Sequence, residues 1–109
     1  MRISILSLLA ATLMLAACSN PLPADKSAYA GDWHANGFFL SITPDGYVHY
    51  KRVGAVSKTI NAPLKRFEGD NFVVGVGPMS TTFIVSAVPH ADGDVWKMTV
   101  DGVELRKLP

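Results

Sequence analysis

The chain is short of cysteine and of charge, and both shortages exclude classes of protein. It has a single Cys in 109 residues, so a disulfide-stabilised scaffold is excluded. Charged residues make up only 17% of the chain, with ten Lys and Arg against nine Asp and Glu. Arg2 is the one basic residue before Cys18, so nine basic and nine acidic groups remain from Cys18 onward. A neutral body lacks the cation excess that binds phosphate, so no nucleic acid is expected as a partner.

The one long apolar run lies at the N-terminus. Residues 3–15 are apolar except for two serines and a threonine, and they follow Met1-Arg2. This run is shorter than the roughly 20 apolar residues that a membrane-spanning helix needs. A basic start, a short apolar core and small residues at the end are typical of a secretory signal peptide. We therefore expect residues 1–17 to be a cleaved signal.

The segment ends in Leu15-Ala16-Ala17-Cys18, which resembles the lipobox of bacterial lipoproteins. The resemblance implies cleavage before Cys18 and a thioether-linked diacylglycerol on that cysteine, with palmitate as an acyl group, and this lipid would hold the protein at a membrane. Buried acyl chains anchor a protein at about 0.8 kcal/mol per methylene. The alternative is an ordinary signal peptide followed by an incidental cysteine. Ser19, where an aspartate would indicate retention in the inner membrane, implies the outer membrane and a body that faces the periplasm.

Residues 18–30 contain two prolines and no hydrophobic periodicity, so we interpret them as the lipidated cysteine and a flexible tether. Residues 31–109 are enough for one small domain. Turn residues divide that domain into short apolar segments, and no stretch has a helical period. This pattern predicts an all-β fold, an antiparallel meander of seven or eight short strands rolled into a small barrel or half-barrel. The expected strands are 38–43, 47–51, 55–60, 64–67, 72–76, 81–88, 95–100 and 103–107, with a break at 61–63.

The first hairpin has a register set by its turn. Pro44-Asp45-Gly46 is a three-residue loop in which proline starts the turn and glycine takes the left-handed position. This loop pairs Ile42 with Val48 and Leu40 with Tyr50. Alternation along the strands then predicts one core face, which consists of Phe38, Leu40, Ile42, Val48 and Tyr50.

The last two segments form a second hairpin around Asp101-Gly102. An Asp-Gly pair between alternating strands favours a two-residue turn with positive φ at both positions. The turn pairs Val100 with Val103 and Met98 with Leu105. The core side of this hairpin is predicted to hold Trp96, Met98, Val100, Val103 and Leu105.

The face of the first hairpin that points away from the core carries Phe39, Tyr47 and Lys51. Aromatic residues near a basic residue on an exposed sheet face are typical of a recognition patch for a protein partner. The alternative is that a neighbouring strand, the tether or Tyr29 covers them.

Two other sets of polar residues contain candidate catalytic or metal-ligating side chains. Ser41 and His49 are expected to oppose each other, but no acid is placed by the sequence to orient the imidazole. Asp32, His34 and the segment His90-Ala-Asp-Gly-Asp94 contain metal-ligand types, yet their spacing is that of polar turns. We therefore expect no enzyme, no metal and no cofactor.

Three resemblances bear on function. Gly31-Asp32-Trp33 resembles the Gly-x-Trp that opens the barrel of lipocalins, which implies a carrier of a small apolar ligand. The size, the lipobox and the β-rich body resemble the periplasmic lipoprotein inhibitors of lysozyme, but the cysteine pair and the Ser-Gly loop of that family are absent. The segment 96–105 is similar to the endings of small uncharacterised proteobacterial envelope lipoproteins and implies no activity. The expected function is a membrane-anchored binding module for an envelope protein, with the lipocalin-like carrier as the alternative.

Overall fold

The computed structural model describes residues 20–109. The expected signal peptide and the lipobox with Cys18 lie outside the described residues, so both stay predictions. Within the described part of the chain, no helix is both long enough and apolar enough to cross a membrane. Its one helix is a short 3-10 helix, η1 (Ala24–Tyr29).

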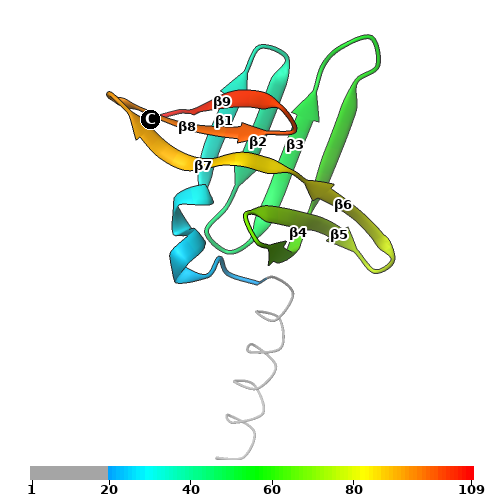
Figure 1. The fold of residues 1–109 in the computed structure, drawn as a ribbon. Helices are drawn as coiled ribbons and strands as arrows, with labels where there is room; N and C mark the ends of the chain where they lie inside the picture. The colour runs from blue at the N-terminus through cyan, green and yellow to red at the C-terminus, as the bar shows by residue number, and fades with distance from the viewer. Residues whose placement is uncertain (1–19) are drawn as a thin grey trace, which may run out of the picture.

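Residues 20–109 fold as the predicted all-β, antiparallel sheet, curled into a half-barrel (Figure 1). The sheet contains nine strands rather than seven or eight, in the order β6-β5-β4-β3-β2-β1-β9-β8-β7. Neighbours in the sheet are also neighbours in the sequence, except that β1 pairs with β9. The strands are β1 (Gly31–Ala35), β2 (Phe38–Ile42), β3 (Tyr47–Arg52), β4 (Lys58–Glu68), β5 (Asn71–Val76), β6 (Met79–Phe83), β7 (Val85–Asp92), β8 (Val95–Val100) and β9 (Val103–Lys107).

The two edges of this sheet are joined through one residue. β6 and β7 lie at opposite ends of the strand order, yet only Ile84 separates them in the chain. The N–H of Ile84 donates to Oδ1 of Asp101 at 2.9 Å, and the N–H of Asp101 donates to the carbonyl of Ile84 at 2.8 Å. These bonds connect this corner to the β8–β9 turn, so the chain itself brings the edges of the half-barrel together.

Both predicted hairpin registers are confirmed. Ile42 pairs with Val48 and Leu40 with Tyr50, and Gly46 has a φ of 90°. The second hairpin pairs Met98 with Leu105 and Val100 with Val103, and φ is positive at both Asp101 (48°) and Gly102 (79°).

The core lies on the inner face of the curled sheet. All five predicted core residues of the first hairpin are buried, together with Met98, Val100 and Leu105 of the second. The centre is filled by aromatic rings: Phe72 stacks on Phe83 at 4.9 Å between centroids, and Tyr50 meets Phe83 edge-on at 5.1 Å. The other members of the cluster are Tyr29, Trp33, Ala62, Leu64, Val74 and Val85.

The prediction that Trp96 is a core residue is wrong. Its side chain is 43% exposed, and Val103 is only half-buried. Trp96 lies near the start of β8, where its partner on β7 is the exposed Ala91 and Lys107 lies beside its ring. Alternation therefore predicted the position of Trp96 in the strand but not its burial.

The predicted break at 61–63 is also wrong, because β4 is one strand of eleven residues. Pro63 lies where this strand changes partners: Tyr47–Pro63 is the last pair with β3, and Leu64–Val74 is the first with β5. The register then shifts between Leu64 and Arg66. A residue without an N–H is tolerated at such an irregularity, where the hydrogen-bond ladder is already interrupted.

Residues 22–30, which belong to the segment 18–30 predicted as a flexible tether, are packed on the sheet, so the prediction is wrong for this part of the segment. The N–H of Leu22 donates to the carbonyl of Pro44 at 3.1 Å, and Tyr29 in η1 is 3% exposed. The ring of Tyr29 meets Phe67 edge-on at 5.0 Å, and its hydroxyl donates to the carbonyl of Asp70 at 2.8 Å. These residues are therefore part of the folded domain.

Candidate functional site

The outer face of the sheet aligns side chains in rows, because paired residues of adjacent strands point to the same side. One row runs across five strands and places two cations, a histidine and an aromatic ring in line. Phe39 on β2 is paired with Lys51 on β3 and, on its other side, with His34 on β1. His34 is paired in turn with Arg106 on β9, and Lys51 with Thr59 on β4. We call Lys51, Phe39, His34 and Arg106 the outer row.

The outer row is open to solvent. Phe39 is 39% exposed, and Lys51, His34 and Arg106 are all exposed. Strands in a sheet lie about 4.8 Å apart, so the four residues span about 15 Å. Within residues 20–109, neither Lys51 nor Arg106 forms an ion pair. The row therefore presents an exposed aromatic ring between Lys51 and His34, with Arg106 on the next strand.

Of the three patch residues predicted from the sequence, the structure brings Phe39 and Lys51 together but places Tyr47 apart. Tyr47 is at the other end of β3, four residues from Lys51, which corresponds to about 13 Å along a strand. It is half-buried and packs against the ring of His49 at 4.9 Å between centroids. Tyr29 lies in the core cluster, so it does not cover this patch.

A second outer row contains Asp32, Ser41, His49 and Asn61, paired in that order across β1 to β4. Nδ1 of His49 lies 2.8 Å from Oδ1 of Asn61, so Asn61 is an orienting group that the sequence did not reveal. A nucleophile–base pair requires a hydrogen bond between the serine hydroxyl and the imidazole. Among the described residues, Asn61 is the one hydrogen-bond partner of the His49 ring, so this row has the arrangement of a polar surface.

The metal-ligand types near the β7–β8 turn have other partners. Nδ1 of His90 lies 2.8 Å from the carbonyl of Val88, and the Lys97 ammonium donates to Asp92 at 2.7 Å. That hydrogen bond lowers the pKa of Asp92 and raises the pKa of Lys97. Across residues 20–109, no three His, Cys, Asp or Glu side chains converge on one point.

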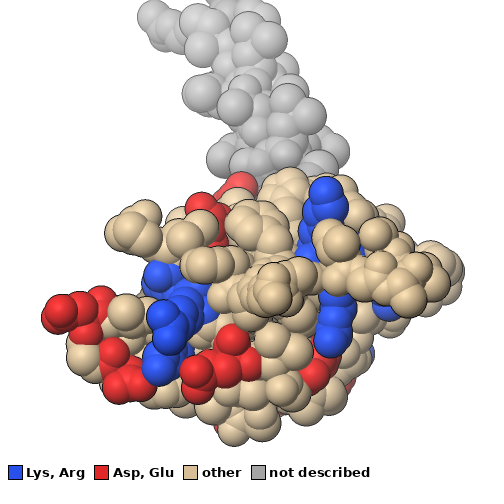
Figure 2. All heavy atoms as spheres, turned by 90° about the horizontal axis from the view of Figure 1, so that it is seen from above, with Lys and Arg blue, Asp and Glu red and all other residues tan. Residues whose placement is uncertain are grey.

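The surface charges are mixed in sign. Figure 2 shows Lys and Arg interspersed with Asp and Glu on the face seen from above. Exposed pairs such as Arg66–Glu68 at 2.9 Å neutralise part of the charge. The outer row therefore carries two cations and no carboxylate, on a domain with no net charge.

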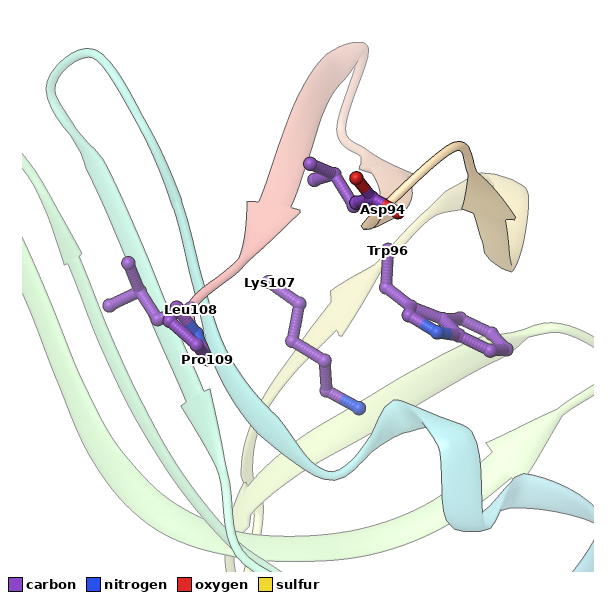
Figure 3. Close-up of a pocket in the computed structure, with 6 residues that line it drawn as sticks. Asp94, Trp96, Lys107, Leu108 and Pro109 are labelled. Atoms are coloured by element: carbon purple, nitrogen blue, oxygen red, sulfur yellow. The ribbon is translucent and has the colours of Figure 1, made fainter.

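Among the hollows at the surface of the described residues, three are considered for ligand binding. One, of about 270 Å³, lies where β4 diverges from the β5–β6 hairpin. A second, of about 310 Å³, lies between η1 and the β2–β3 turn. The third, of about 300 Å³, lies beside the β7–β8 turn and the C-terminal residues (Figure 3). All three are open grooves rather than enclosed cavities.

No family model, curated protein or solved structure matches this chain. Function is therefore inferred from the geometry of the outer face and from the N-terminal sequence.

Proposed function

We propose that the chain is a membrane-anchored envelope lipoprotein whose β domain is a non-enzymatic binding module for a periplasmic or outer-membrane protein, as an inhibitor or an accessory factor. The lipid on Cys18 is the anchor, in the outer membrane, and the domain faces the periplasm. The lipobox at 15–18 supports this part of the proposal. Mass spectrometry of the purified protein should find an acylated N-terminal Cys18, and an unmodified thiol would contradict the anchor.

The outer row supports the binding function. Covering the ring of Phe39 removes apolar surface from water, and a buried aromatic anchor is the usual centre of a protein interface. Lys51 lies directly beside the ring, Arg106 lies one strand beyond His34, and neither forms an ion pair among the described residues. The partner that fits this row has an apolar pocket bordered by carboxylates, because such carboxylates would pair with the two cations.

The interior gives no support to the lipocalin-like carrier. A carrier of an apolar ligand needs a lined cavity. In this half-barrel the centre is filled by Trp33, Phe72 and Phe83, each no more than 1% exposed. Binding at the outer face is therefore the function that we propose.

The decisive experiment is affinity capture of the tagged full-length protein from envelope extracts. We expect a partner that is retained by the wild type and lost by Phe39→Ala and by Lys51→Glu, with a smaller loss for Tyr47→Ala. Val88→Ala is the matched control, because Val88 is an apolar residue of similar exposure (42%) on β7. Far-UV circular dichroism should show that all variants are folded.

Capture of the same proteins by all four variants would contradict the outer row as the binding site. Hydrolytic activity of the purified protein that disappears in His49→Ala would instead assign an enzyme to the second row.

A further inference from the structure

The hollow beside the β7–β8 turn is lined by three kinds of polar or aromatic side chain: a cation, an indole and a carboxylate. It is lined by Asp94, Val95, Trp96, Lys107, Leu108 and Pro109 and has a volume of about 300 Å³. Figure 3 shows the side chains of Trp96 and Lys107 beside each other, with Asp94 above them and Leu108 and Pro109 on the other side of Lys107. A cation, an indole and a carboxylate thus border one open groove.

Lys107 supplies a cation with unused hydrogen-bonding capacity. Its Nζ lies 5.2 Å from the ring centroid of Trp33 and 5.9 Å from that of Trp96. Its one hydrogen bond within residues 20–109 is a long one, 3.4 Å, to the carbonyl of Ala28, and no carboxylate lies within 4 Å of it. An ammonium carries three donors, so at least two can be given to an anionic ligand.

Trp96 supplies an apolar surface for stacking. It is 43% exposed, whereas Trp33, the other tryptophan, is fully buried. Leaving an indole this open discards stabilisation that its burial would provide, and such exposure next to a groove is typical of a ligand surface. Asp94 is exposed at the rim and forms no ion pair within the described chain, so its carboxylate is free to accept hydrogen bonds from a ligand.

We propose that this hollow binds an acidic saccharide, one sugar ring that bears a carboxylate. The C–H face of the ring stacks on Trp96, the carboxylate accepts hydrogen bonds from Nζ of Lys107, and the ring hydroxyls donate to Asp94. A neutral sugar has no carboxylate to accept hydrogen bonds from Nζ of Lys107. An aromatic carboxylic acid without hydroxyl groups has no donors for the carboxylate of Asp94. The volume fits a single ring with one side in solvent, as for one unit of an acidic glycan. Lys107 is paired with the inner-face residue Trp33 and lies over its ring, so the site is on the opposite face of the sheet from the outer row.

Ligand binding can be followed by tryptophan fluorescence, because both tryptophan rings lie beside Lys107. The full-length protein, in a detergent without a sugar headgroup, is titrated with glucuronate while tryptophan emission is recorded. We expect a saturable change, with glucose at least about tenfold weaker, the factor for one charge-assisted hydrogen bond of about 1.4 kcal/mol. Lys107→Met should weaken glucuronate binding by a similar factor, and Lys107→Arg should retain it.

Trp96→Phe should reduce the emission change, because only Trp33 then remains beside Lys107, and calorimetry on that variant should show weaker binding. Circular dichroism of each variant separates loss of the site from loss of the fold. The assignment is overturned if wild type shows no saturable change up to the solubility of glucuronate, if glucose binds as tightly, or if calorimetry finds Trp96→Phe unchanged. Tighter binding of L-phenylalanine would reassign the site to a zwitterion and would also refute the saccharide.

Discussion

Tyr29 tests whether the residues before the first strand belong to the fold. The side chain is buried among Phe67 and Phe72 and donates one hydrogen bond to the carbonyl of Asp70. Tyr29→Ala removes the whole ring and should lower the free energy of unfolding by about 3–5 kcal/mol, as for other buried aromatic residues. Tyr29→Phe removes only the hydroxyl and should cost about 0.5–1 kcal/mol, because the exposed Asp70 turn allows water to reach the freed carbonyl.

Urea denaturation followed by circular dichroism measures both effects. With a slope of about 1 kcal/mol per M for a small domain, the midpoint should fall by about 3 M or more for Tyr29→Ala and by about 0.5–1 M for Tyr29→Phe. The matched control is Ser27→Ala, an exposed position in the same helix, which should change stability by less than about 0.5 kcal/mol. A wild-type midpoint for Tyr29→Ala would refute the packing of η1 and restore the tether interpretation.

The same residue makes a pH prediction. Burial, with a contribution from the charge of Asp70, raises the pKa of Tyr29 from 10.0 to about 12. Because the folded state holds the proton more tightly than the unfolded state, this contribution is complete below pH 10 and is lost as the pH rises towards 12. The difference in stability between wild type and Tyr29→Phe should therefore shrink across that interval, and a constant difference would contradict the raised pKa.

Two further pairs of substitutions test the turns that connect the strands. Gly46 and Gly69 both have positive φ, so an alanine at either position costs about 1–3 kcal/mol of backbone strain. Gly46→Ala should destabilise the domain more, because only there would the new methyl collide with the carbonyl of Asn20. Equal midpoints in urea would contradict this contact. Asp101→Ala should lower the free energy of unfolding by about 1–2 kcal/mol, because it removes the hydrogen bond from the N–H of Ile84 and places alanine at a left-handed φ. Asp101→Asn keeps a side-chain oxygen and should be nearly neutral. Thermal denaturation measures both variants, and equal melting temperatures would contradict the role of Asp101.

The hairpins were predictable because two independent signals agreed at each. At the β2–β3 and β8–β9 turns, the turn residues required the same register as the alternation of apolar side chains. The missed strand β1 had a signal of the same kind, since Asn36-Gly37 lies between Ala35 and Phe38, which are paired in the structure. The predicted break at 61–63 is wrong because Pro63 does not end a strand. It lies at the point in β4 where the pairing partner changes from β3 to β5.

The candidate site was only partly predictable for a related reason. Phe39 and Lys51 belong to one hairpin, so local turn geometry was sufficient to place them together. Arg106 joins them through the β1–β9 pairing, which connects residues more than 70 positions apart and leaves no local trace in the sequence. The predicted burial of Trp96 is wrong for a different reason. Alternation assigns a side chain to one face of the sheet but does not show how far the core extends along that face.

The bond between Leu22 and Pro44 determines how far the domain can stand from its anchor. Only three residues separate Leu22 from Cys18, so a chain of four steps reaches at most about 14 Å. With the proposed lipid on Cys18, the β2–β3 turn would lie close to the lipid headgroups. The protein would then diffuse in the plane of the membrane and would not reach partners deeper in the periplasm. Partners would then have to come to the membrane surface, where confinement to two dimensions raises their effective concentration and rewards weak contacts.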